Sequence, residues 1–353
     1  MDREGKGEKL EAWDWWYYAE KLRQEKYDLN EDAIKPYFSQ EDVHNGLCTV
    51  VNKLYGITLT PCDSISVYNK DVKTYIVKDA DGSLLGVFYS DYMPRASKRS
   101  GAWMSNFREQ QEGVRPLIYN VASFTKPAGD LPSLLTIDEA RTMYHEFGHA
   151  LHGLLTQCKY KGCVWYFCSS GFRWNFLHRL WNIGLYHLEV LKMYAKHYQT
   201  REAIPDSLIA KIENQTLFNQ GFMTTELLAA AILDMEMHCL TTMEGFDVLQ
   251  FEKQLMDKLG LIPQIAPRYR STYFNHIMGG YAAGYYSYIW AERLDTDAFE
   301  AFKEHGLFDQ ATATSFRKNI LEKGGSDDPM KLYVTFRGAE PSLDALLKTR
   351  GLK

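Results

Sequence analysis

Residues 136–156 read TIDEARTMYHEFGHALHGLLT, and this stretch decides the fold of the chain around it. Thr136, followed three residues later by Glu139, has the pattern of a capping box, which marks the start of a helix. At about 100° per residue, one apolar stripe follows, formed by Met143, Phe147, Ala150 and Leu154. We therefore expect a helix whose apolar stripe faces the core of the protein.

Three histidines, His145, His149 and His152, lie on the side of this expected helix that faces away from the stripe. His145 and His149 are one turn apart, which aims both imidazoles at one point that a zinc ion can occupy. Glu146 lies beside them, where it can accept a proton from water rather than bind the metal. For His152, we expect a supporting or packing role rather than ligation.

The H-E-x-x-H motif fixes only three of its five positions, so its context matters. Residues 115–124, RPLIYNVASF, form a strand candidate just before the helix, and Pro116 near its start predicts an edge position. Zinc peptidases need this combination, because the strand holds the substrate backbone while the helix presents metal and base. The pattern therefore predicts a zinc metallopeptidase.

The flanking sequence predicts a mostly α (α+β) fold. Residues 50–93 contain short β-rich runs with a turn at Asp79-Ala80-Asp81-Gly82, which predicts a small antiparallel sheet. Residues 8–34 have the pattern of a helix. After Thr136 nearly everything is expected to be helical, with breaks at Pro205, Pro263, Pro267 and the Gly324-Gly325 pair.

Composition narrows the class of protein. The chain has 353 residues, of which 45% are hydrophobic and 24% charged, as in ordinary globular proteins. Its net charge of -5 indicates that the surface as a whole is not positively charged and does not attract polyanions, so we expect no nucleic-acid partner. The amino terminus is charged and lacks an apolar run for a signal peptide or a membrane span, so we expect no membrane partner and a cytoplasmic location. Six cysteines are too sparse for a disulfide framework, which favours reduced thiols.

Beyond the motif helix, the chain resembles the thimet oligopeptidase family of zinc peptidases, on the side of its bacterial peptidyl-dipeptidases (dipeptidyl carboxypeptidases). The resemblance is carried by PRYRSTYF (267–274), FNHIMGGYAAGYYSYIW (274–290) and the terminal FRGAEPSLDALLKTRGL. It implies a zincin-like catalytic domain, one zinc ion and hydrolysis of short peptides with release of C-terminal dipeptides. It also implies a long helical N-terminal half. We therefore expect residues 1–45 to be a helical remnant of that half and residues 46–353 to be the catalytic domain, and we expect a monomer.

In that family, the histidine and tyrosines of the pattern H-x-x-G-G-Y-x-x-x-Y-Y-x-Y reach the scissile carbonyl and the substrate backbone. The matching residues here are His276, Tyr281, Tyr285 and Tyr288. The resemblance implies that His276 and Tyr288 are catalytic, since a phenol or imidazole donor can stabilise an oxyanion. Tyr281 and Tyr285 would bind substrate. The alternative is a glycine-rich turn that enters an aromatic-faced core helix.

The sequence departs from the family at the third zinc ligand. The resemblance implies a Glu roughly 25 residues past the second histidine, and Trp174 and Asn175 stand at that place. The 42 residues from Phe147 to Leu188 contain no Asp or Glu, although the overall composition predicts about five. Codons available to residues 165–187, read in shifted frames, can spell the family's segment. We therefore infer compensating frameshifts across these residues.

Three functional hypotheses follow from the sequence. The first is a zinc-dependent peptidase, with dipeptidyl-carboxypeptidase or endopeptidase action. The second is a truncated, frame-damaged and inactive homologue that lacks the third ligand. The third is a zinc-binding scaffold whose site is completed by Cys158, Cys163 or His178. Zinc content measured together with turnover of a short blocked peptide separates the three.

Overall fold

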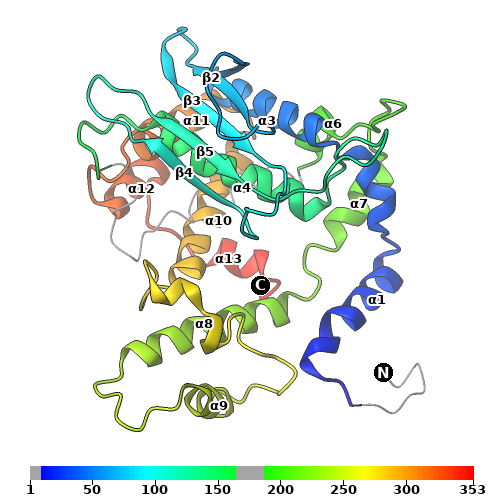
Figure 1. Ribbon diagram of the computed structural model, residues 1–353, viewed down its shortest axis with the longest axis vertical. Coiled ribbons are helices and arrows are strands. Elements are labelled where there is room, and N and C mark those ends of the chain that lie inside the picture. The colour runs from blue at the N-terminus through cyan, green and yellow to red at the C-terminus, as the bar shows by residue number, and fades with distance from the viewer. Residues whose placement is uncertain (1–8, 164–186) are drawn as a thin grey trace.

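The computed structural model describes residues 9–163 and 187–353 (Figure 1). Helices predominate in them, and one five-stranded sheet has the strand order β1-β2-β3-β5-β4. The strands are β1 (Thr58–Pro61), β2 (Lys73–Lys78), β3 (Leu84–Asp91), β4 (Trp103–Arg108) and β5 (Leu117–Val121). The predicted mostly α (α+β) class is confirmed.

Strands β2 and β3 form the predicted hairpin. The amide of Gly82 donates to the carbonyl of Asp79 over 2.9 Å, and Gly82 has a φ of +84°, a conformation that favours glycine. Strands β1, β2 and β3 pair antiparallel, as expected from residues 50–93. Strand β5, however, pairs in parallel with β3, so the sheet as a whole is mixed rather than antiparallel.

The edge position predicted for residues 115–124 is wrong, because β5 lies between β3 and β4. Pro116 is tolerated there because it precedes the strand, and its carbonyl still accepts the amide of Val87 over 3.1 Å. β4 is the edge strand next to β5. A proline just outside a strand therefore gives no information about whether that strand is at an edge.

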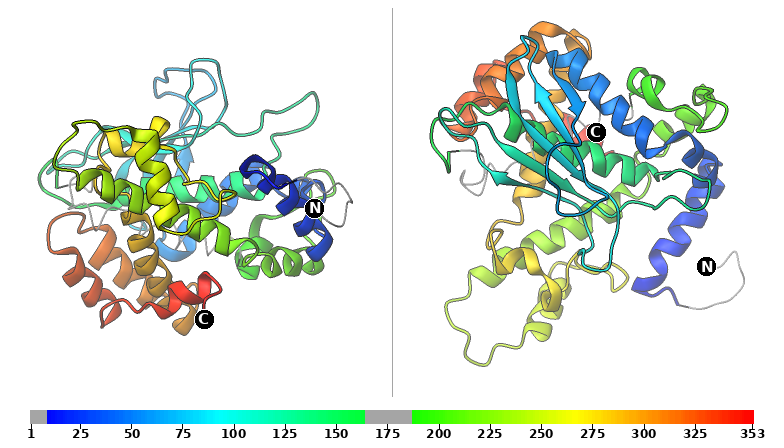
Figure 2. Two further views of the ribbon diagram at one scale, coloured as in Figure 1. Left: turned by 90° about the horizontal axis from the view of Figure 1, so that it is seen from below. Right: turned by 45° about the horizontal axis from the view of Figure 1, so that its top comes forward.

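Helices α3 (Gln40–Tyr55) and α4 (Ile137–Leu155) pack against the same face of the sheet (Figure 2). Phe147 of α4 contacts the ring of Phe88 edge to face, with 5.1 Å between centroids. Gly153 allows the close approach, since a Cβ at that position would lie 2.8 Å from the side chain of Ile118. All four residues of the predicted apolar stripe are fully buried, as expected.

Among the other helices, α6 and α11 pack against α3, whereas α8 and α9 lie at the far end of the molecule from the sheet (Figure 1). These other helices are α1 (Trp15–Tyr27), α2 (Glu31–Ile34), α6 (Leu188–Tyr194), α7 (Asp206–Asn214), α8 (Gln220–His238), α9 (Val248–Lys258), α10 (Ser287–His305), α11 (Gln310–Phe316), α12 (Pro329–Arg337) and α13 (Asp344–Thr349). Short 3-10 turns include η5 (Ser271–Tyr273) and η6 (Asn275–Met278), and η7 (Arg317–Leu321) is a π-helical turn.

The expected helix over residues 8–34 is broken in the structure. Asp28 adopts a left-handed conformation with a φ of +47°, which ends α1. Asn30 then starts α2, since its side chain accepts the amide of Asp32 over 2.9 Å. The expected division between residues 45 and 46 falls inside α3 and stays a prediction. Within the described residues, no helix combines the length and the apolar character that crossing a membrane requires.

Candidate active site

The start of α4 has the capping box that the sequence predicts. The hydroxyl of Thr136 accepts the amide of Glu139 over 3.1 Å, and the Glu139 carboxylate accepts the amide of Thr136 over 2.9 Å. The same carboxylate also accepts the amide of Thr125 over 2.8 Å. Glu139 therefore fixes both the first turn of α4 and the loop that leads into it.

His145 and His149 lie one turn apart on α4 and are both half-buried. Their ring centroids are 5.3 Å apart with an interplanar angle of 77°. The Nε2 atom of His145 lies 3.9 Å from a carboxylate oxygen of Glu146, whose side chain is only 8% exposed. The helix thus brings two imidazoles and one carboxyl group together, as the motif predicts.

Burial sets the protonation of this group. It raises the pKa of Glu146 to about 8, because a charged carboxylate loses its hydration there. It lowers the pKa of His149 to about 4 for the same reason, which favours the neutral ring. Neutral imidazole is the form that binds a metal ion.

His152 lies opposite the apolar stripe, as the helical period predicts, but it is buried. Its side chain is 1% exposed, although the helical period places it opposite the core stripe. Burial lowers the pKa of His152 well below the ordinary value, and electrostatic repulsion from the neighbouring His149 adds a smaller lowering. The prediction that it faces away from the stripe holds, and it is nevertheless buried because protein covers this end of the helix on all sides. Its supporting or packing role stays a prediction.

His145 and His149 suit two nitrogen positions of a zinc site, which needs a third protein ligand. The part of the chain that the structure describes contains no cluster of three or more His, Cys, Asp or Glu that could hold a metal ion. The Cys158 thiol donates to the carbonyl of Cys163 over 3.2 Å, at the far end of α4, so a site completed by these cysteines is not supported. The remaining candidate, His178, lies outside the described residues, as do Trp174 and Asn175 at the place of the expected Glu and the inferred frameshift apart from its last residue.

The second set of predicted residues forms an aromatic cluster around His276. The centroid of the His276 ring lies 5.8 Å from Tyr281, 5.5 Å from Tyr285 and 6.2 Å from Tyr288. Tyr281 stacks on Tyr288 at 5.3 Å. The structure therefore brings His276 and the three tyrosines predicted with it together, at the junction of η6 and α10.

The environment of the cluster keeps its groups neutral. Burial, aided by the charge of Arg268, lowers the pKa of His276. Burial also raises the pKa of Tyr285 and of Tyr288 above the ordinary range. The phenols therefore stay protonated at neutral pH and remain able to donate a hydrogen bond.

Tyr269 belongs to the same cluster but was not singled out in the sequence. Its ring lies 4.6 Å from that of His276 and stacks on Phe274 at 5.3 Å. The signal was present in PRYRSTYF, where aromatic residues approach the tyrosine pattern. Their convergence depends on the turns η5 and η6, which no hydrophobic period marks.

The two groups come from different parts of the fold. The group of α4 lies beneath the sheet, whereas the tyrosine cluster lies between α8 and the start of α10 (Figure 1). The roles that both groups would have toward one substrate stay predictions.

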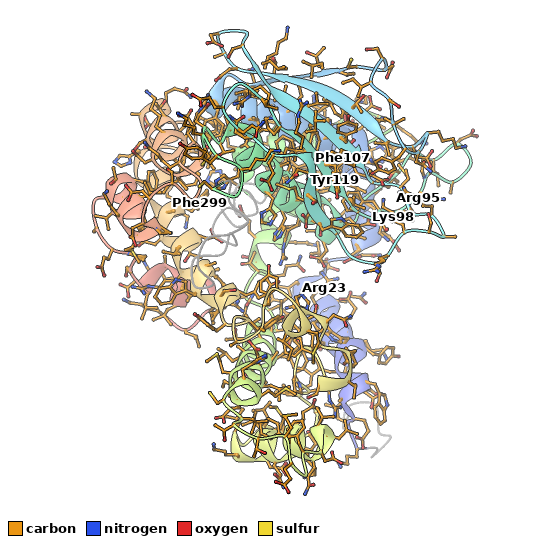
Figure 3. All side chains as sticks on the ribbon, turned by 60° about the vertical axis from the view of Figure 1, so that its left-hand side comes forward. Arg23, Arg95, Lys98, Phe107, Tyr119 and Phe299 are labelled. Carbon is orange, nitrogen blue, oxygen red and sulfur yellow. The ribbon has the colours of Figure 1, made fainter. Side chains whose placement is uncertain are left out.

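A buried ion cluster shapes the loop ahead of the edge strand β4. Asp91, at the end of β3, binds Arg95 through two hydrogen bonds of 2.8 Å and Lys98 through one of 3.0 Å. The Lys98 amine also donates to the carbonyls of Met93 and Ala122. Figure 3 shows Arg95 and Lys98 beside the sheet, near Phe107 of β4 and Tyr119 of β5. Residues 93–98 are thus tied to the sheet before β4 begins.

The chain shares sequence with peptidases over nearly its whole length. It matches the family model described as Peptidase family M3 over residues 1–352. It is 41% identical over 358 residues to the dipeptidyl carboxypeptidase of Escherichia coli (strain K12), covering 100% of this chain and 52% of that protein. Oligopeptidase A of the same organism is 34% identical, with 98% and 52% covered. The probable cytosolic oligopeptidase A of Arabidopsis thaliana is 38% identical, with 97% and 51% covered.

The chain spans about half the length of these curated relatives. Among solved structures, the M32 carboxypeptidase from Deinococcus radiodurans R1 matches with a TM-score of 0.50 and 13% sequence identity, covering 91% of this chain and 61% of that one. This likeness shows a shared fold. The sequence relatives confirm the family resemblance found in the sequence: the chain belongs to peptidase family M3, whose members are in general zinc-dependent metallopeptidases.

Proposed function

We propose that this chain carries the catalytic part of a zinc metallopeptidase that hydrolyses short peptides and releases C-terminal dipeptides. The observation that carries the proposal is the arrangement on α4, where two half-buried imidazoles flank a buried carboxyl group. The 41% identity to a dipeptidyl carboxypeptidase supports the choice of product.

In this proposal, His145 and His149 hold the zinc ion together with a third ligand. When bound, the ion supplies a Lewis acid that acidifies water and polarises the peptide carbonyl. In its charged form, which a cation beside it would favour over the neutral form set by burial, Glu146 accepts the proton of the attacking water and passes it to the leaving amine. The nearby Nε2 of His145, at 3.9 Å, is consistent with a carboxylate placed beside the ligands.

The tyrosine cluster has a separate role in the proposal. Tyr288 and His276 donate hydrogen bonds to the oxyanion that forms when water adds to the carbonyl. Tyr281 and Tyr285 contact the substrate backbone. The support for these roles is that all three tyrosines gather around His276, and that burial keeps Tyr285 and Tyr288 protonated.

The edge strand β4 is proposed to bind the peptide backbone. It packs against α4, and β5 is its one neighbour among the strands of the described residues, so its other edge is the one that an added strand would pair with. This role replaces the one expected for residues 115–124.

The test compares three properties of the purified protein: zinc content, cleavage of a short peptide and the products released. The free acid and the C-terminal amide of one peptide form a matched pair that tests whether the C-terminal carboxylate is recognised. Mass spectrometry identifies the products. Cleavage at internal bonds without dipeptide products contradicts dipeptide release, and no cleavage by zinc-loaded protein contradicts the peptidase.

An inactive homologue is the second candidate. It is favoured by the stretch from Phe147 to Leu188 without Asp or Glu, and by Trp174 and Asn175 at the place of the expected ligand. Protein that binds less than one zinc ion and cleaves neither peptide supports this candidate. The gene's nucleotide sequence tests whether frameshifts caused the loss of the ligand. If they did, the codons of residues 165–187 must spell the family's segment when they are read in the shifted frames.

We further propose that the protein acts as a monomer in the cytoplasm, on short peptides rather than on nucleic acid or membranes. The cytosolic relative of Arabidopsis thaliana supports the location. Sedimentation and cell fractionation test these two points.

A further inference from the structure

We infer that Asp234 of α8 is a positioning residue for the tyrosine cluster, because its carboxylate holds the glycine-rich turn of residues 279–286 in one conformation. The functional meaning of this inference rests on the proposed function, which gives the cluster its role. The structural inference itself does not depend on zinc or on peptide cleavage.

Asp234 is fully buried and follows the apolar run Leu227–Leu233 of α8. One carboxylate oxygen accepts the amide of Ala283 over 2.9 Å, and the other accepts the amide of Tyr285 over 2.8 Å. The residues in each bond are about fifty positions apart in the sequence. A buried carboxylate is costly unless hydrogen bonds compensate it, so these two amides account for its presence in the apolar helix.

The two amides belong to the most constrained part of the turn. Ala283 has a φ of +49°, a left-handed conformation that residues with a Cβ rarely adopt. Gly284 follows it and is buried, and Tyr285 is the next residue. Such a conformation persists only where surrounding contacts determine it, and the carboxylate supplies a contact on each side of Gly284.

The position of these bonds explains how a residue of α8 affects the aromatic rings. The Tyr285 ring lies 5.5 Å from that of His276 and 4.9 Å from that of Tyr288. α10 begins only two residues after Tyr285, and Tyr288 is the second residue of α10. The backbone at Tyr285 therefore also sets the position of the Tyr288 side chain. Fixing the amide of Tyr285 therefore fixes the start of α10 and the rings around His276.

The carboxylate is itself held in place. The Nδ1 atom of His238, one turn further along α8, hydrogen-bonds the backbone carbonyl of Asp234 over 2.8 Å and also lies 2.9 Å from the carboxylate oxygen that accepts Ala283. A second buried carboxylate, Glu252 of α9, accepts the amide and the hydroxyl of Ser271, each over 2.7 Å, before the pattern begins. The segment that bears the cluster is thus bound at both ends by acids from other helices.

The experiment measures amide hydrogen exchange at single-residue resolution in the whole chain. Asp234→Ala removes both acceptors, so we expect the amides of Ala283 and Tyr285 to exchange about 10- to 100-fold faster. Asp234→Asn keeps the volume and one acceptor oxygen, so it should restore protection to one of the two amides. This rescue identifies the carboxylate oxygens, rather than mere filling of space, as the cause.

Asp247→Ala is the matched control. Asp247 accepts the amides of Leu249 and Gln250, each over 2.9 Å, at the exposed start of α9. Its loss should speed exchange of those two amides and leave Ala283 and Tyr285 unchanged. Circular dichroism checks that each variant keeps its helices, and Asp234→Asn still tests the inference if Asp234→Ala does not fold.

The second readout is the environment of the tyrosine rings, followed by ¹³C-tyrosine NMR with assignments from Tyr285→Phe and Tyr288→Phe. Both ring resonances should shift in Asp234→Ala and stay in place in Asp247→Ala. Unchanged exchange at Ala283 and Tyr285 overturns the inference, and so do faster amides with unshifted rings. Neither measurement uses peptide cleavage, so failure of the proposed function is seen separately.

Discussion

The helix α4 and the tyrosine segment of residues 269–288 contribute the two halves of the candidate site in different ways. In α4, a capping box, an apolar stripe and two histidines lie within twenty-one residues, and helical geometry alone arranges them. The tyrosine segment has short 3-10 turns, a left-handed Ala283 and a glycine-rich loop before α10. Its rings converge because Asp234 and Glu252 bind its backbone from other helices.

The difference indicates which substitutions should disturb the structure of each half. α4 is stabilised by the sheet through Phe147 and by its own hydrogen bonds, so substitutions of its polar residues should leave the fold intact. The tyrosine segment depends on a few long-range bonds, so the loss of one acceptor should displace several rings. The following changes test this comparison, beginning with the largest expected effect.

The largest effect should come from restoring the family's segment across residues 165–187. The chain as written should retain zinc weakly after dialysis, because two imidazoles lack a third ligand. Zinc affinity and turnover of Asn175→Glu alone should stay about 10- to 100-fold below those of the chain with the whole segment restored. The reason is that a metal ligand is held in position by supporting hydrogen bonds, which the single substitution does not restore. Zinc analysis and peptide turnover measure both variants.

Two outcomes would contradict this account. Full peptide hydrolysis by Asn175→Glu alone would show that the frameshift is over-interpreted. Micromolar or tighter zinc retained by the unmodified chain would point to a substitute ligand among Cys158, Cys163, Cys168, His178 and His187.

In the version with the restored segment, Glu146→Gln should lower turnover about 10²- to 10⁴-fold, or about 3 to 5 kcal/mol, with zinc retained. Glutamine keeps the size of the side chain but cannot accept the proton. Steady-state kinetics and zinc analysis on the same sample measure the two properties. If zinc is lost and residual activity follows zinc content, Glu146 is a ligand or a structural residue instead.

Tyr288→Phe in the same background should lower kcat about 10²- to 10³-fold with zinc retained, because it removes one oxyanion donor. Tyr273→Phe is the matched control, since Tyr273 is an exposed tyrosine outside the pattern. If both variants lose the same activity, or neither does, the tyrosine cluster does not contribute an oxyanion donor at Tyr288. Such a result would contradict the proposal that α4 provides the metal ligands and the base while the tyrosine segment provides the oxyanion donors.

The smallest effect concerns stability on the α4 side of the comparison. Arg317 of η7 donates to Asp79 of the β2–β3 turn over 2.9 Å, and this bond holds the pKa of Asp79 below its usual range. Because the folded pKa is lowered, the stabilisation is present above the ordinary carboxyl pKa and is lost as pH falls through the folded value. Asp79→Asn should therefore cost about 1.5 to 3 kcal/mol at pH 7 and progressively less in acid.

Urea unfolding at neutral and acidic pH measures this effect. Asp81→Asn in the same turn is the matched control, because the Asp81 carboxylate accepts the amide of Ser83 rather than a guanidinium. Equal losses for the two variants at neutral pH, or a loss that does not change with pH, would contradict the role of the Arg317 pair. Exchange at Ala283 and Tyr285 should not respond to Asp79→Asn, which would confirm that the two regions are stabilised separately.

Much of α4 and its surroundings could be predicted from the sequence. Thr136 with Glu139 gave the helix start, the apolar stripe gave the buried face, and Asp79–Gly82 gave the hairpin turn. These features depend on residues a few positions apart. The edge position of residues 115–124 was wrong because strand order depends on which distant strand pairs with β5, and Pro116 lies outside that ladder.

The sequence by itself determined the class of fold, the family and the spacing of His145, Glu146 and His149, because helical hydrogen bonds act over four residues and repeat. Only the tertiary structure decided that β4 rather than β5 is an edge strand, that His152 is buried and that the Asp234 carboxylate accepts the amide of Ala283 in the turn. Each of these depends on contacts between residues far apart in the chain. Their geometry is set when the apolar surfaces of the helices and the sheet pack together, and no local period records it.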